Sequence, residues 1–277
     1  MRHLVSHPPA AFDVIAPVYD CTFTWSHVGR AQREATRREL DRLYRPGQRI
    51  LELNCGTGVD AVHLAGRGID VLACDISSGM IEQAWKRADE ARQKSAVCGD
   101  IDFRILATED IGKLRGEGMA GRFDGAFSNF AGLNCVEDLS AVARDLSSLL
   151  KPGALLLVCV FGRFCLWEVL WYLGHAMPAK ALRRLRAEEP DAHLAEGVTL
   201  RIKYPSVRKL AHLFAPEFRL MRWRGVGVAT PPTYVESFVH RFPRLFHEFN
   251  KLDRPLGACP IVRAMADHVL LAFERRG

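Results

Sequence analysis

Residues 51–58 read Leu51-Glu52-Leu53-Asn54-Cys55-Gly56-Thr57-Gly58, the end of an apolar run followed at once by a glycine-bearing turn. Gly56 and Gly58 let the chain turn tightly and let a ligand approach the backbone. The helix expected from Val59 presents its free N–H groups and the positive end of its dipole at the same place. The stretch therefore predicts a strand–turn–helix unit with a ligand-binding turn, as in many nucleotide-binding folds.

Strand-like and helix-like segments alternate along the chain after this unit. Strands are expected at residues 49–53, 69–74, 101–105, 123–128 and 154–161, with two later ones at 218–223 and 268–273. Such alternation predicts an α/β fold with a doubly wound, mostly parallel, seven-stranded sheet of the Rossmann-like kind. Ligands in these sheets bind beyond the carboxyl ends of the strands, so the residues that follow each strand are the candidates for binding.

The chain of 277 residues is expected to form one domain, 1–277, with four parts. These are an N-terminal helical lid at 1–45, a cofactor-binding core at 46–161, a helical cap insertion at 162–205, and the final strands with their connecting helix at 206–277. The apolar stretch 154–177 is interrupted by Arg163 and Glu168. It is therefore expected to be a buried strand that runs into a helix rather than a membrane span.

Composition places the chain among ordinary globular proteins. Hydrophobic residues make up 48% and charged residues 25%, which argues against global disorder. The net charge of +6 allows a nucleic acid or anionic lipid partner without requiring one. The basic run at 183–186 is followed by Glu188 and Glu189, and it is expected to be a solvated helix face.

The cysteines and residues 1–9 indicate in which cellular compartment the protein is expected. The eight cysteines include no C-x-x-C pair, so no metal or redox site is expected and a reducing environment is indicated. Residues 1–9 lack the apolar stretch of a signal peptide. These features together predict a cytoplasmic location.

Two carboxylates narrow the choice of ligand. The pattern Gly56-x-Gly58-x-x-Ala61 also fits the dinucleotide fingerprint, but Glu52 would repel a pyrophosphate and attract an ammonium group. Asp75 ends the second strand, where an acidic residue can accept hydrogen bonds from ribose hydroxyls. The pair favours a nucleoside with an amino-acid tail and no phosphate. The alternative is that Glu52 caps the neighbouring helix or pairs with an arginine, and that Asp75 caps the next helix.

At this point the sequence resembles the class I S-adenosylmethionine-dependent methyltransferases, especially the ubiquinone/menaquinone-type small-molecule enzymes. Residues 52–58 resemble the first motif of that family, with Asn54 where a glycine is usual, and 75–80 resemble the second. Residues 108–111, 123–128 and 149–153 match later landmarks, and 12–20 resemble the lid segment. The resemblance implies a methyltransferase with S-adenosyl-L-methionine as its cofactor.

The resemblance also implies a set of cofactor-binding residues. Asp75 would contact the ribose, Ile76 and Met80 the adenine, and Thr108 with Glu109 the region of the adenine amino group. Met80 could equally be plain helix core, and Tyr19 is either a lid contact or core. The full predicted set is Tyr19, Glu52, Asn54, Gly56, Gly58, Asp75, Ile76, Met80, Thr108, Glu109, Ser128 and Asn129.

The acceptor is less well specified than the cofactor. Ser128-Asn129-Phe130-Ala131 lacks the prolines of the amino-DNA methyltransferase motif, so nucleic-acid bases are not expected as substrates. A group of aromatic residues outside the core could roof an apolar acceptor pocket, glue the insertion to the sheet, or contact a membrane surface. These residues are Phe161, Phe164, Trp167, Trp171, Tyr172, Phe238, Phe242 and Phe246.

The predicted function is transfer of a methyl group from S-adenosylmethionine to a small apolar or aromatic molecule by in-line displacement. The ten histidines offer candidate bases, including His27, His175 and His240, but none is singled out. Two alternatives stay open. One is an NAD(P)-dependent oxidoreductase, which Glu52 and the absence of a Tyr-x-x-x-Lys pair disfavour. The other is a non-catalytic protein that binds S-adenosylmethionine. Neither the acceptor atom nor the oligomeric state follows from the sequence.

Overall fold

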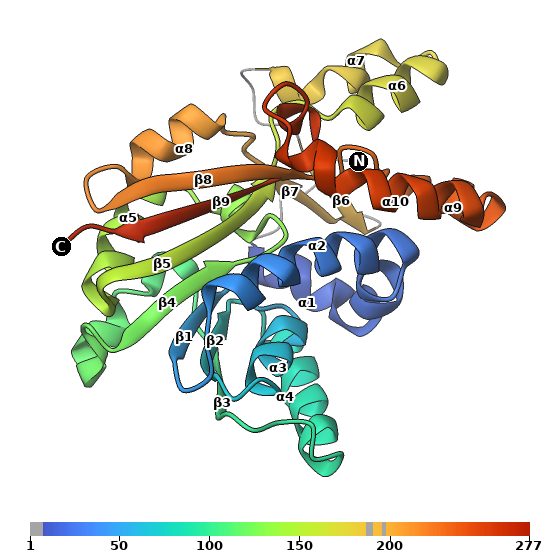
Figure 1. Cartoon of the computed structure of the whole chain (residues 1–277). Helices are drawn as coiled ribbons and strands as arrows, with labels where there is room; N and C mark the ends of the chain where they lie inside the picture. The colour runs from blue at the N-terminus through green and yellow to red at the C-terminus, as the bar shows by residue number, and fades with distance from the viewer. Residues whose placement is uncertain (1–7, 187–190, 196–197) are drawn as a thin grey trace.

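The computed structural model describes residues 8–186, 191–195 and 198–277, and its centre is a seven-stranded sheet in the order β3-β2-β1-β4-β5-β9-β8 (Figure 1). Neighbouring strands from β3 to β5 are parallel, whereas β9 runs antiparallel to both β5 and β8. The predicted mostly parallel sheet is confirmed. The strands are β1 (Arg49–Leu53), β2 (Asp70–Asp75), β3 (Ile101–Ile105), β4 (Phe123–Ser128), β5 (Leu150–Phe161), β8 (Phe218–Val226) and β9 (His268–Arg275).

Strand β5 begins earlier than predicted. Leu150 already pairs with Phe123, and the regular ladder resumes at Leu155 opposite Gly125. Between them lies Lys151-Pro152-Gly153, with Gly153 at φ +75°. This proline and glycine end the preceding helix, as expected, but the extended chain around them pairs with β4 rather than forming a loop.

Helices cover both faces of the sheet, as the alternation of side chains along β1 shows. Leu51 and Leu53 face a core formed with α5 and α8, whereas Ile50 faces the core under α2, α3 and α4. Because side chains alternate along a strand, Glu52 lies on the same face as Ile50. The helices of the sheet layers are α2 (His27–Leu43), α3 (Val59–Ala65), α4 (Ser78–Gln93), α5 (Leu139–Leu149), α8 (Val207–Phe214) and α10 (Pro243–Ala258).

The N-terminal helix α1 (Pro8–Tyr19) is held on the core by carboxylates. Asp13 accepts hydrogen bonds from the Ser77 hydroxyl at 2.5 Å and from the Gly79 N–H at 2.8 Å, at the start of α4. In the π-helical turn η1 (Asp20–Thr24), Asp20 accepts a bond from the Thr57 hydroxyl at 2.8 Å and pairs with Arg87. These contacts place the end of α1 next to the glycine-bearing turn.

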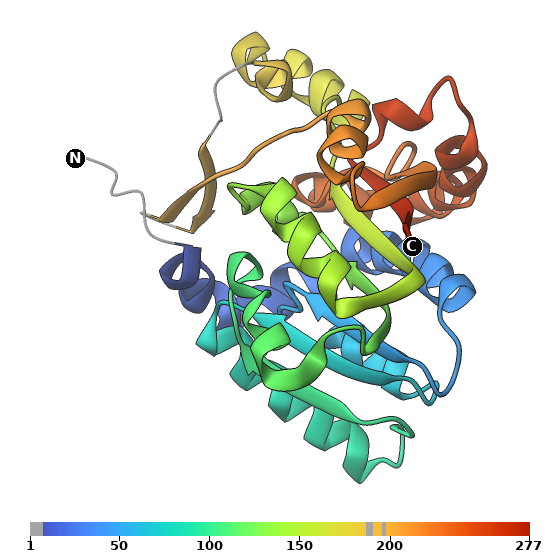
Figure 2. The same ribbon diagram turned by 90° about the vertical axis from the view of Figure 1, so that its left-hand side faces the viewer.

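The segment predicted as a helical insertion, 162–205, is only partly helical. It contains α6 (Leu166–Gly174), α7 (Pro178–Ala181) and the 3-10 turn η5 (Arg183–Leu185), followed by the strand pair β6 (Asp191–Ala195) and β7 (Val198–Arg201). The pair contacts α1 (Figure 2). The β-branched Val198 and Thr199 favour a strand, a signal that the helix prediction overlooked.

The predicted solvated face at 183–186 is wrong for Arg184, whereas Arg186 is exposed. Arg184 is buried, because its guanidinium binds Glu168 on α6 and Asp267 just before β9. Short connecting elements complete the chain: η2 (Thr108–Asp110), η3 (Arg115–Met119), η4 (Gly132–Cys135), η6 (Thr233–Val235), α9 (Glu236–Arg241) and η7 (Arg263–Met265). None of the helices in the described part of the chain is both long and apolar enough to cross a membrane.

Candidate active site

A cavity of about 400 Å³ lies at the carboxyl edge of the parallel strands. Residues just after β1, β2, β3 and β4 line it, together with α1, η1, the end of β5 and the start of β9. Because β9 is antiparallel, its amino end meets the same edge. This is also where strand order reverses between β1 and β4, the position at which open α/β sheets bind ligands.

Asp75 supplies a fixed carboxylate to the cavity wall. One of its oxygens accepts the Gly56 N–H and the other accepts the Ser77 N–H, both at 2.9 Å. Burial raises the pKa of Asp75, although these two bonds act in the opposite direction. Gly56 has φ +54° and open space where a Cβ would project. The wall therefore offers a carboxylate beside bare backbone, which suits a ribose lying against the turn.

Nine of the twelve predicted cofactor residues line this cavity. They are Tyr19, Asn54, Gly56, Asp75, Ile76, Met80, Thr108, Glu109 and Asn129. They come from four strand ends, from α1 and from the first turn of α4, so the topology brings residues distant in sequence to one place. Burial raises the pKa of Tyr19 to about 12, so its hydroxyl remains a hydrogen-bond donor at neutral pH.

Glu52, Gly58 and Ser128 are not among the lining residues of the cavity. A Cβ at Gly58 would come within 2.8 Å of Ala84 and Phe103, so this glycine permits packing of α3 against α4 and β3. Ser128 donates a hydrogen bond to the Asn54 side chain at 3.1 Å. Gly58 and Ser128 therefore support the cavity wall without lining it.

Glu52 is buried, with 2% of its surface exposed, and one carboxylate oxygen has no hydrogen-bond partner among the described residues. Burial raises its pKa well above the ordinary value, and nearby Asp60 raises it further. A buried carboxylate without a full set of partners is complementary to a cation. The predicted pairing of Glu52 with an ammonium group stays a prediction.

Asn54 stands in the left-handed region, with φ +54°. Asparagine tolerates this region better than most residues, although glycine does so more easily. Its side chain packs against Gly132, where a Cβ would lie 2.4 Å away. With the bond from Ser128, this side chain joins the turn after β1 to the loop after β4.

Asn129 and Gln32 both line the cavity, and each has a buried carbonyl oxygen without a hydrogen-bond partner among the described residues. The Asn129 amide donates to the Thr36 hydroxyl at 3.0 Å and to Asp60 at 2.9 Å, and the Gln32 amide donates to Asp267 at 3.2 Å. A carboxylate only accepts, so in each residue the nitrogen must face it. The remaining oxygens are buried and have no partner in the described part of the chain. They are suited to a ligand rich in donors, such as an ammonium group.

Asp267 and His268 were not predicted as site residues from the sequence. His268 lines the cavity with its ring stacked on Phe161 at 4.6 Å and edge-on to Phe130 at 5.8 Å. Its Nδ1 lies 3.2 Å from an Asp267 oxygen. The sequence places a histidine at the first position of the apolar strand β9. This position indicates a site residue only when β9 is known to be antiparallel, because its amino end then meets the carboxyl ends of the parallel strands.

Asp267 belongs to a buried ionic group with Arg184 and Glu168. Arg184 lies 2.7 Å from Asp267 and 2.9 Å from Glu168, and all three residues are at most 5% exposed. Burial alone would raise the pKa of Asp267, but the attraction of His268 and Arg184 holds it well below the ordinary value. Asp267 is therefore an anion that orients its neighbours.

Most of the aromatic residues considered for a roof over the acceptor do not line the cavity. Of the eight aromatic residues named above, only Phe161 is among the described residues that line the cavity. Trp167 donates to the Ala229 carbonyl at 2.9 Å and packs on Phe249, and Tyr172 packs on Tyr234. The apolar wall is instead formed by other residues. These are Phe12, Ile15, Phe23, Phe130, Val136, Leu200 and Ile202.

Comparisons with known proteins identify the family of this chain. A family model described as a methyltransferase domain matches residues 50–153. A demethylmenaquinone methyltransferase from Parafrankia sp. (strain EAN1pec) is 32% identical over 229 residues, which cover 79% of this chain and 86% of that relative.

Solved structures share the fold. A SAM-dependent methyltransferase from Methanosarcina mazei has a TM-score of 0.58 at 18% identity, over 86% of this chain and 96% of that chain. The [4+2]-cyclase SpnF has a TM-score of 0.60 at 18% identity, over 97% and 94%. The likeness to these solved structures shows the fold alone. The activity is inferred from the relatives that are similar in sequence. The chain belongs to the S-adenosylmethionine-dependent methyltransferases, and S-adenosylmethionine is its cofactor.

Proposed function

We propose that this methyltransferase acts on a small hydroxylated aromatic molecule of the hydroquinone type, with His268 as the base. The position of His268 carries the proposal: an imidazole held between two aromatic rings in the apolar wall of the cavity. The relatives named demethylmenaquinone methyltransferase support a quinone-type acceptor.

The cofactor half of the cavity consists of the residues that follow β1, β2 and β3. Asp75 would accept hydrogen bonds from the ribose, Ile76 and Met80 would pack on the adenine, and Glu109 would lie near its amino group. The ammonium group would be bound by the unpaired oxygen of Asn129, with Glu52 beneath it. The members of this half are Asn54, Gly56, Asp75, Ile76, Met80, Thr108 and Glu109.

The acceptor half lies across the cavity, beyond the end of β4. Its apolar side chains would hold an aromatic ring and keep water from the reacting atoms. Cys135 is no nucleophile here, since burial raises its pKa to about 12 and leaves it a thiol. The members of this half are Phe130, Cys135, Val136, Phe161, Leu200, Ile202, Asp267 and His268.

His268 would accept the proton that the acceptor loses. S-adenosylmethionine, when bound by the residues of the cofactor half, would supply an activated methyl group to an acceptor atom that lies in line with the methyl–sulfur bond. Deprotonation of a phenolic hydroxyl makes the acceptor more nucleophilic at oxygen and at the adjacent ring carbon. Asp267 stabilises the imidazolium that forms, because its anionic state is held by Arg184.

The test is transfer of labelled methyl to a panel of acceptors. The panel contains a short-chain demethylmenaquinol analogue, the corresponding dimethyl ether, a catechol and an aliphatic alcohol. We expect transfer to the hydroquinone and none to the dimethyl ether, which has no hydroxyl proton to lose. Normal binding of S-adenosylmethionine with no transfer to either hydroxylated aromatic compound would refute the proposed acceptor class.

A further inference from the structure

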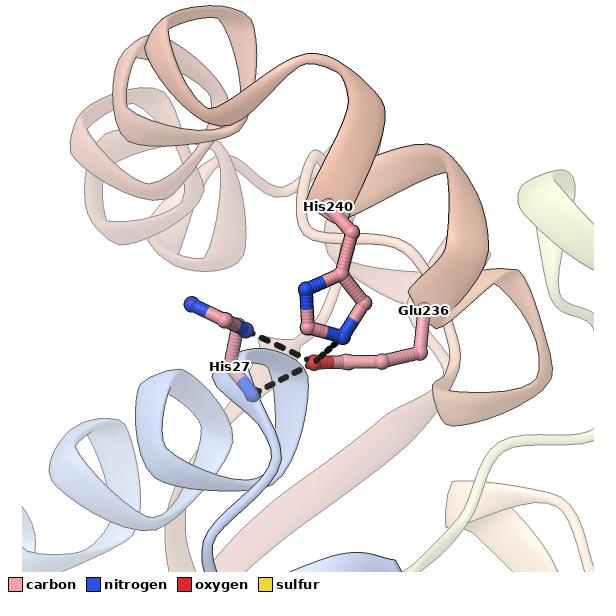
Figure 3. Close-up of side chains that lie close together, drawn as sticks. All are labelled: His27, Glu236 and His240. Atoms are coloured by element: carbon pink, nitrogen blue, oxygen red, sulfur yellow. Dashed lines mark hydrogen bonds and ion pairs between the residues drawn. The ribbon is translucent and has the colours of Figure 1, made fainter.

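Two histidines and a glutamate meet on the outer surface of the molecule (Figure 3). His27 is the first residue of α2, while Glu236 and His240 lie four apart on one face of α9. Their side chains point toward one another, and one ligand atom from each lies within 4.8 Å of the other two. None of the three lines the cavity described above.

The Glu236 carboxylate is held in place by the backbone of α2. One oxygen accepts the His27 N–H at 2.6 Å, and the other accepts the Val28 N–H at 3.2 Å. The carboxylate is thereby fixed between the two imidazoles. Such bonds from neighbouring groups orient ligands in metal sites.

The distances between donor atoms fit a tetrahedral ion. His27 Nδ1 lies 2.9 Å and His240 Nε2 lies 3.8 Å from the same Glu236 oxygen. Ligand bonds of about 2.0–2.1 Å at tetrahedral angles place donor atoms about 3.3 Å apart. The distances of 2.9 Å and 3.8 Å lie on either side of this value, and all three donor atoms lie within 4.8 Å of one another, so the side chains would have to rotate to bind one ion together.

We propose that His27, Glu236 and His240 form a binding site for a divalent ion of the zinc type. Two imidazoles and one carboxylate are a ligand set that zinc accepts, with water in the fourth position. The side chains of His27 and His240 are 53% and 63% exposed, so an ion and its water can reach the site. The ion would replace the proton between His27 Nδ1 and Glu236.

The site joins two segments that also contribute to the cavity wall. Phe23 precedes His27 by four residues, Thr233 precedes Glu236 by three, and both line the cavity. A bound ion would therefore connect α2 to α9 outside the cavity and hold these two wall segments together. The sequence, which contains no C-x-x-C pair, predicted no metal site. These three ligands come together only in the fold.

The direct test is titration of the chelator-treated full-length protein with Zn²⁺ by calorimetry, and with Co²⁺ by visible absorption. We expect one ion per chain, a tetrahedral Co²⁺ spectrum, and an increase in Tm with added Zn²⁺. His240→Ala should weaken Zn²⁺ binding by at least about tenfold, as the loss of even an outer-shell partner costs 10–100-fold. His212→Ala removes an exposed histidine on α8 and should change nothing.

A second variant tests the site by a new spectroscopic signal rather than by a loss of metal binding. His240→Cys should retain Co²⁺ and add a thiolate-to-cobalt charge-transfer band. Absence of stoichiometric Zn²⁺ binding by the wild-type protein, or equal affinity in His27→Ala, His240→Ala and wild type, would overturn the proposal. No methyl acceptor is needed in any of these measurements, so the result is independent of the function proposed above.

Discussion

The proposed cofactor half and the proposed acceptor half of the cavity are built in different ways. The cofactor half uses residues immediately after three adjacent parallel strands, and a carboxylate held by two backbone N–H groups is its main polar feature. The acceptor half combines β5, β9, the loop after β4 and the segment after β7, and its polar feature is an imidazole on an ionic network. One half depends on local turns, the other on long-range packing.

This difference predicts that substitutions in the two halves affect different measured quantities. The largest effect should come from His268→Ala, which removes the proposed base. General-base catalysis contributes about 10²–10⁴-fold, so kcat should fall by that factor. The Kd for S-adenosylmethionine should change little. Steady-state kinetics and calorimetry on the same preparation measure both, with His212→Ala as the control.

An equal loss in kcat and in cofactor affinity would mean that the two halves are not separable. The pH profile distinguishes a base from a structural role. Loss of a base should remove the acidic limb of kcat, whereas damage to packing should lower the whole profile evenly.

The next effect is on stability. Asp267→Asn removes the anion that faces Arg184 and leaves that guanidinium buried with fewer partners. Breaking a buried pair in this way costs about 3–5 kcal/mol, so the free energy of unfolding should fall by that amount in urea denaturation. Glu274→Gln breaks a surface pair with Arg219 and should cost less than about 1 kcal/mol. Equal costs for both variants would contradict the proposed role of the network.

The stabilisation by Asp267 should depend on pH in a defined direction. Its folded-state pKa is lowered from 3.8, so its contribution is present above that value and is lost as the pH falls below it. The difference in unfolding free energy between wild type and Asp267→Asn should therefore shrink as the pH falls below about 4. A difference that grew on acidification below pH 4 would have the wrong sign.

A smaller effect is expected in the cofactor half. Asp75→Asn should weaken S-adenosylmethionine binding by about 10–100-fold, since hydrogen bonds to a charged group contribute about 1.5–3 kcal/mol. The Asp102 side chain is exposed on β3, so Asp102→Asn is the matched control. An unchanged affinity of Asp75→Asn for S-adenosylmethionine would show that binding of the ribose does not depend on this carboxylate.

The smallest effect is predicted for Asn54→Gly. Glycine relieves the left-handed strain but loses the packing on Gly132 and the bond from Ser128. These contributions are each about 1 kcal/mol and oppose one another, so unfolding free energy should change by less than about 1 kcal/mol. A loss above 2 kcal/mol in thermal or urea denaturation would make this side chain a main support of the wall.

The cofactor half could be predicted from sequence because its residues follow strands whose apolar pattern is visible. Asp75 is an example: its position at a strand end already implied its place in the wall. The acceptor half could not be predicted, because His268 reaches the cavity only through an antiparallel strand and Leu200 only through a strand pair that contacts α1. The buried state of Arg184 was missed for the same reason, since its two carboxylate partners are 16 and 83 residues away.

The two carboxylates that hold α1 and η1 have a kinetic consequence. Asp13 accepts the Gly79 N–H at the start of α4, and Asp20 pairs with Arg87. In the proposed binding mode, release of the nucleoside would require these polar contacts to break. Dissolved salt weakens such attractions between charged groups that lie near the solvent. Exchange of spent for fresh cofactor should therefore quicken with ionic strength, even where the chemical step is insensitive to it.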